Sequence, residues 1–124
     1  MRKLVLLLLA AGTAGAHQAT EIYIPIGKSP GLSGKVTIIG SCAEVQAKER
    51  AVAIRAGGKS WNGLVTETTK IFLDRSKLRL PNTYGTFEDL RRGRMMEIKY
   101  RDGEGERACE WIKVQVAGEP ASRR

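Results

Sequence analysis

The stretch GKVTIIGSCAEVQA, residues 34–47, decides the fold class that this sequence predicts. It opens with β-branched residues, which favour strands, and the regular strand pattern of the chain begins here. Gly40 stands inside the stretch, and a glycine within a strand pattern indicates a bulge or a bend. The sequence therefore predicts one long first strand that is bent at a bulge.

The residues that follow predict a meander of further strands. Segment 50–56 (RAVAIRA) alternates, with its larger apolar residues on one face. Gly57-Gly58 then forms a two-residue hairpin turn, because both central positions of such a turn favour positive φ. The return strand covers residues 59–66 (KSWNGLVT), and a further extended piece covers residues 69–73 (TKIFL).

A short helix and two more strands complete the pattern. In TFEDLRRG, residues 86–93, Thr86 can cap the first turn, acidic residues occupy that turn, and the closing glycine ends the helix. Strands follow over residues 94–101 and 107–116. This order predicts an all-β fold over residues 34–116, a five-stranded OB-like barrel with one short helix between strands 3 and 4. A small β-sandwich or an open half-barrel is the alternative.

The first 16 residues, MRKLVLLLLAAGTAGA, have the pattern of a secretory signal peptide. Two cationic residues precede an apolar run, and the small residues at the end suit a signal peptidase. The run is shorter than the roughly 20 residues of a membrane span. We therefore expect a periplasmic or secreted mature chain without a transmembrane segment. Its extended N-terminal arm would cover residues 17–33, and its disordered tail residues 117–124.

The charge of the chain restricts the class of partner. The formal net charge is +8, and it remains at +6 once Arg2 and Lys3 leave with the predicted signal peptide. Outside the cytoplasm, such a charge favours an anionic glycan, a lipid headgroup or an acidic envelope protein, and export argues against nucleic acid. A solvated basic surface that only aids solubility is the alternative.

Four motifs resemble a family of small exported bacterial proteins of unknown function with a predicted OB-like β-barrel domain. They are GKVTII (34–39), TETTKI (66–71), DLRRGRMMEIKY (89–100) and EWIKVQV (110–116). The resemblance covers residues 34–116, and it implies the barrel without supplying a chemistry. The two cysteines are not part of that pattern.

Cys42 and Cys109 both lie in strand-like segments. In an oxidising compartment, a disulfide between them is the expected state. Two separate buried thiols are the alternative. Thiol catalysis is not expected, because there is no C-x-x-C motif and the one histidine lies in the predicted arm.

Met95 and Met96 raise the question of a copper site, because some periplasmic copper chaperones are OB-like barrels that bind Cu(I) through methionine, histidine and a stacked tryptophan. Successive strand side chains point to opposite faces, so these two methionines cannot reach one ion. We expect Met96 in the core and Met95 on the wet face. His17, as a mature N-terminus, could chelate Cu(II), so His17 with Met95 is the alternative metal-binding set. No other cofactor is predicted.

Catalysis is not expected. The core region has no histidine that could activate a serine or cysteine nucleophile. Carboxylate pairs occur, but the pair Glu88 and Asp89, for example, suits a helix start, and the pair Glu104 and Glu106 suits a turn.

A binding module is the function class that the sequence favours. OB-like barrels bind ligands over one sheet face with aromatic and basic residues. We expect Trp111 to face outward there, and the predicted ligand-binding residues are Trp111, Lys113, Arg91, Arg92, Arg94, Lys99 and Arg101. Alternatively, the tryptophan covers the end of the barrel and the arginines are solvated. The sequence thus predicts a non-enzymatic exported binding or accessory module that recognises an anionic envelope component or protein partner.

Overall fold

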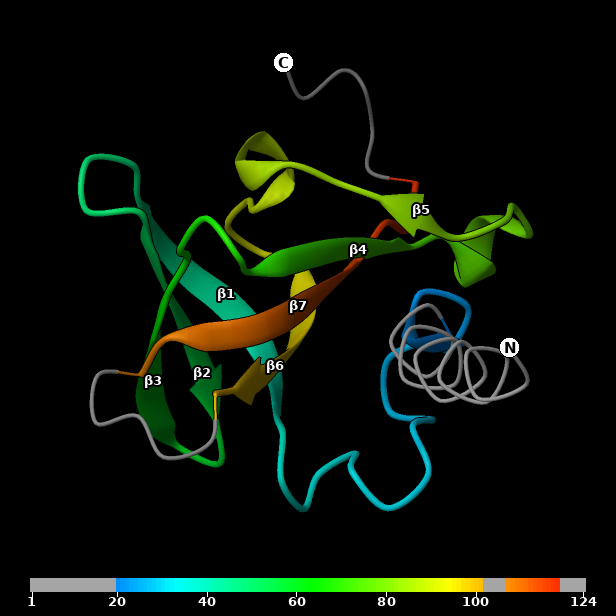
Figure 1. The fold of residues 1–124 in the computed structure, drawn as a ribbon, viewed down its shortest axis with the longest axis horizontal. Helices are drawn as coiled ribbons and strands as arrows, with labels where there is room; N and C mark the ends of the chain where they lie inside the picture. Colours follow the sequence, from blue (N-terminus) through cyan, green and yellow to red (C-terminus); the bar gives the residue numbers. More distant parts are fainter. Residues whose placement is uncertain (1–19, 102–106, 119–124) are drawn as a thin grey trace, which may run out of the picture.

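The fold is built on one mixed sheet in the computed structural model, which describes residues 20–101 and 107–118. Seven strands lie in the order β3-β2-β1-β6-β7-β4-β5 (Figure 1). The elements are β1 (Ile38–Gln46), β2 (Ala51–Ala56), β3 (Lys59–Leu64), β4 (Lys70–Asp74), the 3-10 turn η1 (Ser76–Leu78), β5 (Thr83–Tyr84), the 3-10 turn η2 (Phe87–Asp89), β6 (Met95–Tyr100) and β7 (Cys109–Gln115).

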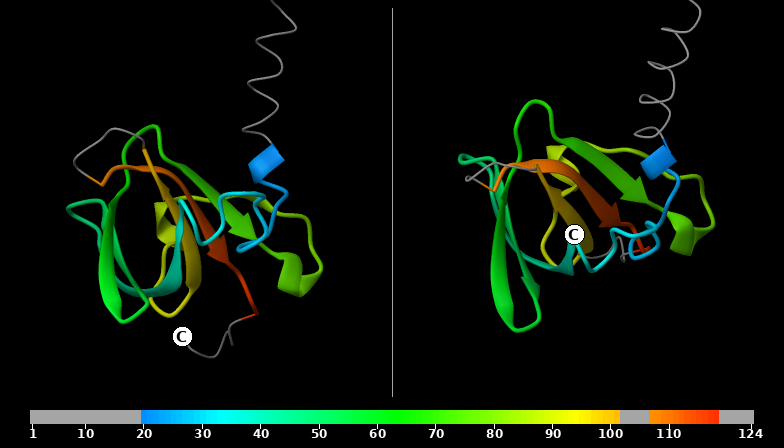
Figure 2. Two further views of the ribbon diagram at one scale, coloured as in Figure 1. Left: turned by 90° about the horizontal axis from the view of Figure 1, so that it is seen from below. Right: turned by 60° about the horizontal axis from the view of Figure 1, so that its bottom comes forward.

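The strand pairing has the connectivity of an OB-type barrel. Strand β1 pairs antiparallel with both β2 and β6. Strand β4 runs parallel to β7, and a parallel bridge joins Leu64, at the end of β3, to Ala108, just before β7. Strands β3 and β4 correspond to the predicted return strand (59–66) and to the further extended piece (69–73), and the first pairs with β2 whereas the second pairs with β7. The curvature that brings β3 and β7 together is visible in Figure 2. The predicted all-β class and OB-type order are confirmed, with seven strands instead of five.

The helix predicted over residues 86–93 is a shorter 3-10 turn. Thr86 is the N-cap residue, and its backbone N–H donates to Oδ2 of Asp89 at 2.8 Å, so the acidic side chain of the first turn supplies this capping contact. Leu90 then adopts an extended backbone and buries its side chain in the core, which ends the turn early. Gly93 follows with a φ of 89°.

Strand β1 has a bulge, but it lies further along the strand than predicted. The register with β2 shifts between Cys42 and Glu44 instead of at Gly40. Gly40 serves close packing, because a Cβ atom there would lie 2.2 Å from the carbonyl oxygen of Arg55. Only glycine allows the two backbones this approach.

The main apolar core lies inside the barrel. Met96 and Ile98 of β6 and Ile112 and Val114 of β7 are fully buried in it. Removing each such side chain from water contributes about 1.5–3 kcal/mol. Met95 is exposed, so the predicted alternation of the two methionines is confirmed.

Residues 20–37 form a strap of consecutive turns that packs on the sheet. The turns are closed by hydrogen bonds such as that from the N–H of Tyr23 to the carbonyl of Thr20 (3.0 Å), and three glycines with positive φ allow the reversals. The prediction of an extended arm over residues 17–33 is therefore wrong for its described part. A second apolar cluster lies between the strap and the sheet, and it consists of Ile22, Leu32, Phe72 and Trp111.

No helix within residues 20–101 and 107–118 has the length and apolar character needed to cross a bilayer. The predicted signal peptide, residues 1–16, and residues 119–124 of the predicted tail lie outside the described residues.

Candidate binding surface

A buried lysine joins the strap to the last strand. Lys113 has only 1% of its surface exposed, and its Nζ donates to Oε1 of Glu21 at 2.7 Å and to Oγ of Ser29 at 2.8 Å. The same ammonium lies 4.6 Å from the centre of the Trp111 ring, a cation–π contact. Its charge is thus neutralised inside the protein and does not face a ligand.

Two buried carboxylates hold the strap in the same way. Glu97 lies opposite Lys113 in the β6–β7 register, and it accepts hydrogen bonds from the N–H of Gly27 (3.0 Å) and from Oγ1 of Thr37 (2.7 Å). Asp74 accepts one from the N–H of Ile26 at 2.9 Å. Buried charges require such partners, so this row of polar residues fixes the strap on the sheet.

The sheet face predicted to bind a ligand is covered. Trp111 has 4% of its surface exposed, and it packs on Phe72 with ring centres 6.4 Å apart. The prediction that Trp111 faces outward is therefore wrong, because the strap covers it. In addition, the register of β6 with β7 shifts between Lys99 and Tyr100, which lets Cys109 enter the main core although it is two residues from Trp111.

The predicted basic residues do not gather into one surface. Arg94 is buried and donates from one guanidinium nitrogen to the carbonyl of Asp89 at 2.9 Å. Lys99 pairs with Glu110 at 2.7 Å. Arg101 donates to the hydroxyl of Thr66 at 3.0 Å and also to that of Thr68. The two that remain exposed are Arg91 and Arg92, which follow η2.

The predicted disulfide is not formed, and both cysteines are free and buried. Cys42 is level with Arg94, to whose carbonyl its N–H donates, whereas Cys109 pairs with Tyr100 at the other end of β6. At about 3.3 Å per residue, these levels are roughly 20 Å apart along the strand. A disulfide requires Cα atoms within about 7 Å.

Each thiol is kept protonated by its surroundings. Burial raises the pKa of Cys109 to about 12, and burial likewise raises the pKa of Cys42. A thiol reacts as its thiolate, so neither side chain has the character of a catalytic nucleophile.

Met95 is placed on the surface, as the metal hypothesis required, but His17 lies outside the described residues. Within the described ranges, no three side chains of histidine, cysteine, aspartate or glutamate gather in a geometry that could hold a metal ion.

A different surface combines positive charge with exposed apolar side chains. Residues 75–84, here called the basic–apolar loop, leave the barrel after β4 and return as β5 (Figure 1). Leu80 and Tyr84 have 46% and 59% of their surfaces exposed, and Leu78 is also exposed. Its cationic residues are Arg75, Lys77 and Arg79. The signal for this surface, three cations interleaved with leucines and no acid in RSKLRLPNTY, is present in the sequence but predicted only a loop.

The basic–apolar loop is held in a defined shape. Nε of Arg75 donates to the carbonyl of Pro81, and its N–H donates to Oδ1 of Asn82, both at 2.7 Å. Arg79 adopts a left-handed backbone with a φ of 59°, which closes η1. Tyr84 rests on Phe72, with ring centres 5.6 Å apart. The nearest carboxylate in sequence, Asp74, is buried, and it accepts hydrogen bonds from Ile26 of the strap and from Ser76 of the loop.

Comparisons with known proteins give a distant likeness of fold. No family model matches the chain, and no curated protein matches it. Two solved structures of CusF match, one with Ag(I) and one a tryptophan variant with Cu(II) from Escherichia coli. Both have a TM-score of 0.45 and 10% identity over 64% of this chain, and they are covered to 95% and 89% of their own lengths. The OB-type assignment rests on the strand pairing of this chain, and the metals are ligands of CusF.

Proposed function

We propose that this protein is a non-enzymatic exported binding module, periplasmic or secreted, that recognises an anionic component of the cell envelope. The observation that carries the proposal is the basic–apolar loop, where exposed cations stand together without an exposed acid in the same segment. Membership of the family of small exported OB-like proteins suggested by the sequence motifs is part of the same proposal.

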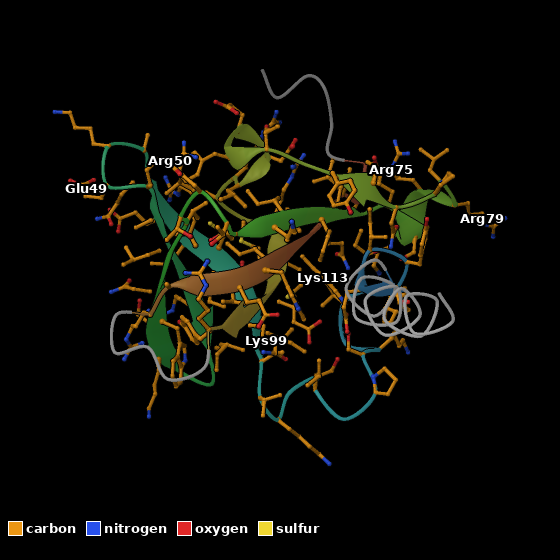
Figure 3. All side chains as sticks on the ribbon, in the orientation of Figure 1. Glu49, Arg50, Arg75, Arg79, Lys99 and Lys113 are labelled. Atoms are coloured by element: carbon orange, nitrogen blue, oxygen red, sulfur yellow. The ribbon has the colours of Figure 1, made fainter. Side chains whose placement is uncertain are left out.

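The charges of this loop suit long-range attraction of an anion. Lys77 and Arg79 are exposed, and Arg79 stands at the outer tip of the loop, well away from Lys99 and Lys113 (Figure 3). Attraction between exposed charges is screened within about 8 Å at physiological salt, so binding through this loop must weaken as salt increases. The covered face around Trp111 contributes no such charge, because Lys113 is already paired with Glu21.

The experiment compares two variants of equal charge. Lys77→Glu with Arg79→Asn lowers the net charge of the basic–apolar loop by three, and asparagine tolerates the left-handed backbone of Arg79. Arg91→Glu with Arg92→Gln removes the same charge from the exposed pair after η2. Retention on a heparin column and binding to anionic vesicles are measured against salt, with thermal melts to verify folding.

We expect the loop variant to lose binding to both probes and the η2 variant to retain it. Loss in the η2 variant alone would move the site to Arg91 and Arg92. Failure of the unaltered protein to bind either probe at low salt would overturn the proposal.

A copper-binding function through His17 and Met95 is the contrasting proposal, supported by the exposure of Met95. It predicts a stoichiometric change in tryptophan fluorescence on titration with copper, and loss of that change in a Met95→Leu variant.

A further inference from the structure

We propose that the basic–apolar loop docks on the surface of an anionic phospholipid bilayer, with Leu78 and Leu80 entering the boundary between headgroups and acyl chains. The inference rests on the proposed function and narrows its partner class to a lipid surface.

The two exposed leucines of the loop favour a bilayer over a soluble anion as the partner. Leu78 and Leu80 flank Arg79 at the tip of the loop and are both exposed. A sulfated glycan or an inorganic anion offers these side chains no apolar environment, whereas a bilayer takes up apolar side chains while its headgroups meet the adjacent cations. The alternation of apolar and cationic residues in SKLRL therefore fits a membrane interface, whereas binding of a soluble polyanion would need only the cations.

The aromatic residue of the loop, Tyr84, suits the headgroup level of a bilayer. Tyr84 is more than half exposed, yet its ring packs in a tilted arrangement against that of Phe72 in β4. Tyrosine is enriched at the level of the headgroups, because its ring is apolar and its hydroxyl is wet. It would flank the inserted leucines from a fixed base on the sheet.

The shape of the loop favours docking without a large loss of conformational freedom. The two contacts of Arg75, with Pro81 and Asn82, already order the loop, and Asp74 orders its start by accepting hydrogen bonds from the N–H and the hydroxyl of Ser76 at 3.0 and 2.7 Å. A preordered segment loses less entropy on binding than a flexible one. The cations supply attraction to phosphatidylglycerol or another anionic lipid.

The first test separates apolar insertion from charge. Leu78→Ser with Leu80→Ser leaves every charge in place, and Val36→Ser, at another exposed apolar residue on the strap, is the matched control. Binding is measured by flotation with vesicles of phosphatidylcholine containing phosphatidylglycerol, and by retention on heparin. We expect the double variant to bind vesicles at least about tenfold more weakly than the unaltered protein, with unchanged heparin retention. The control should behave as the unaltered protein.

A second variant tests the same inference without removing a leucine. Tyr84→Trp places an indole at the proposed depth, and its fluorescence should shift to the blue when these vesicles are added. Equal vesicle binding by the double serine variant, or no blue shift from Tyr84→Trp, overturns docking on a bilayer. If charge removal at Lys77 and Arg79 still abolishes heparin retention in that case, the proposed function stands and only the bilayer is wrong as its partner.

Discussion

Nζ of Lys113 lies 2.7 Å from Oε1 of Glu21, although 92 positions separate the two residues in the sequence. Both side chains are buried, and the pair fixes the strap to β7. The strap and the strand β7 are therefore joined by one charged contact.

Breaking this pair from either side should destabilise the protein strongly. Lys113→Met leaves the Glu21 carboxylate buried without its cation, and Glu21→Leu leaves the ammonium unpaired. We expect each single change to lower the free energy of unfolding by about 3–5 kcal/mol, as removal of one partner of a buried ion pair does. The double variant should lose less than the sum, and urea denaturation of all four proteins provides the cycle. Additive losses would show that the two residues do not depend on each other.

Gly63 and Cys109 should be coupled through their packing. A Cβ atom on Gly63 would lie 2.6 Å from Sγ of Cys109, so Gly63→Ala forces the thiol or a strand to move. Overpacking of this kind costs about 1–3 kcal/mol. Cys109→Ala removes the sulfur, and we expect Gly63→Ala to cost less in that background. An equal cost in both backgrounds, measured by urea denaturation, would contradict the contact.

Both cysteines should be present as unreactive thiols in the folded protein. The structure leaves Cys42 and Cys109 free, buried and far apart along the sheet. Alkylation with iodoacetamide under native conditions should therefore be slow at both, and alkylation in denaturant without reductant should label both. Mass spectrometry counts the labels. Labelling in denaturant only after reduction would show that the two cysteines form a disulfide after all.

Alkaline pH should weaken the fold through Cys109. Its pKa is raised from 9.0 to about 12, chiefly by burial, with a smaller opposing effect of Arg101. Between these values the folded state keeps a proton that the unfolded state releases, so the free energy of unfolding falls as pH rises. The slope from this thiol is up to about 1.4 kcal/mol per pH unit, and the stabilisation is fully present below pH 9.0. Urea denaturation across this window should show a shallower decline in Cys109→Ala, and an identical decline would refute the assignment to this thiol.

Local patterns in the sequence predicted the parts of the fold that depend on neighbours in the chain. Gly57 and Gly58 form the expected hairpin turn, with φ values of 61° and 79°, because turn geometry is set by those two residues alone. The alternation of Met95 and Met96 follows from the two-residue period of a strand. The order of strands sufficed for the OB-type class, since few topologies join such elements.

The covering of the predicted ligand-binding face was harder to predict, because the residues that cause it are distant in sequence. Trp111 and Lys113 are covered by a strap rich in glycine and proline, whose position depends on Glu97 and Asp74 accepting its backbone hydrogen bonds. No local pattern of residues predicts that a lysine will be buried by a segment that is distant in the sequence. The prediction of a disulfide was wrong for a similar reason, because the separation of the two cysteines depends on strand register, which composition does not reveal.

Strand β7 is the partner of β4, of β6 and of the strap, and it is made last of all the elements. During synthesis, Glu21 of the strap is made 92 positions before Lys113, so its contact with that lysine forms only after β7 has been made. The barrel cannot close stepwise from its N-terminus, because the parallel pairing with β4 and the ion pair with Glu21 both require the seven residues of β7. A chain that stops short of β7 leaves β4, β6 and the strap without their common partner, although β1, β2 and β3 can still pair with one another, so completion of the fold depends on this last strand.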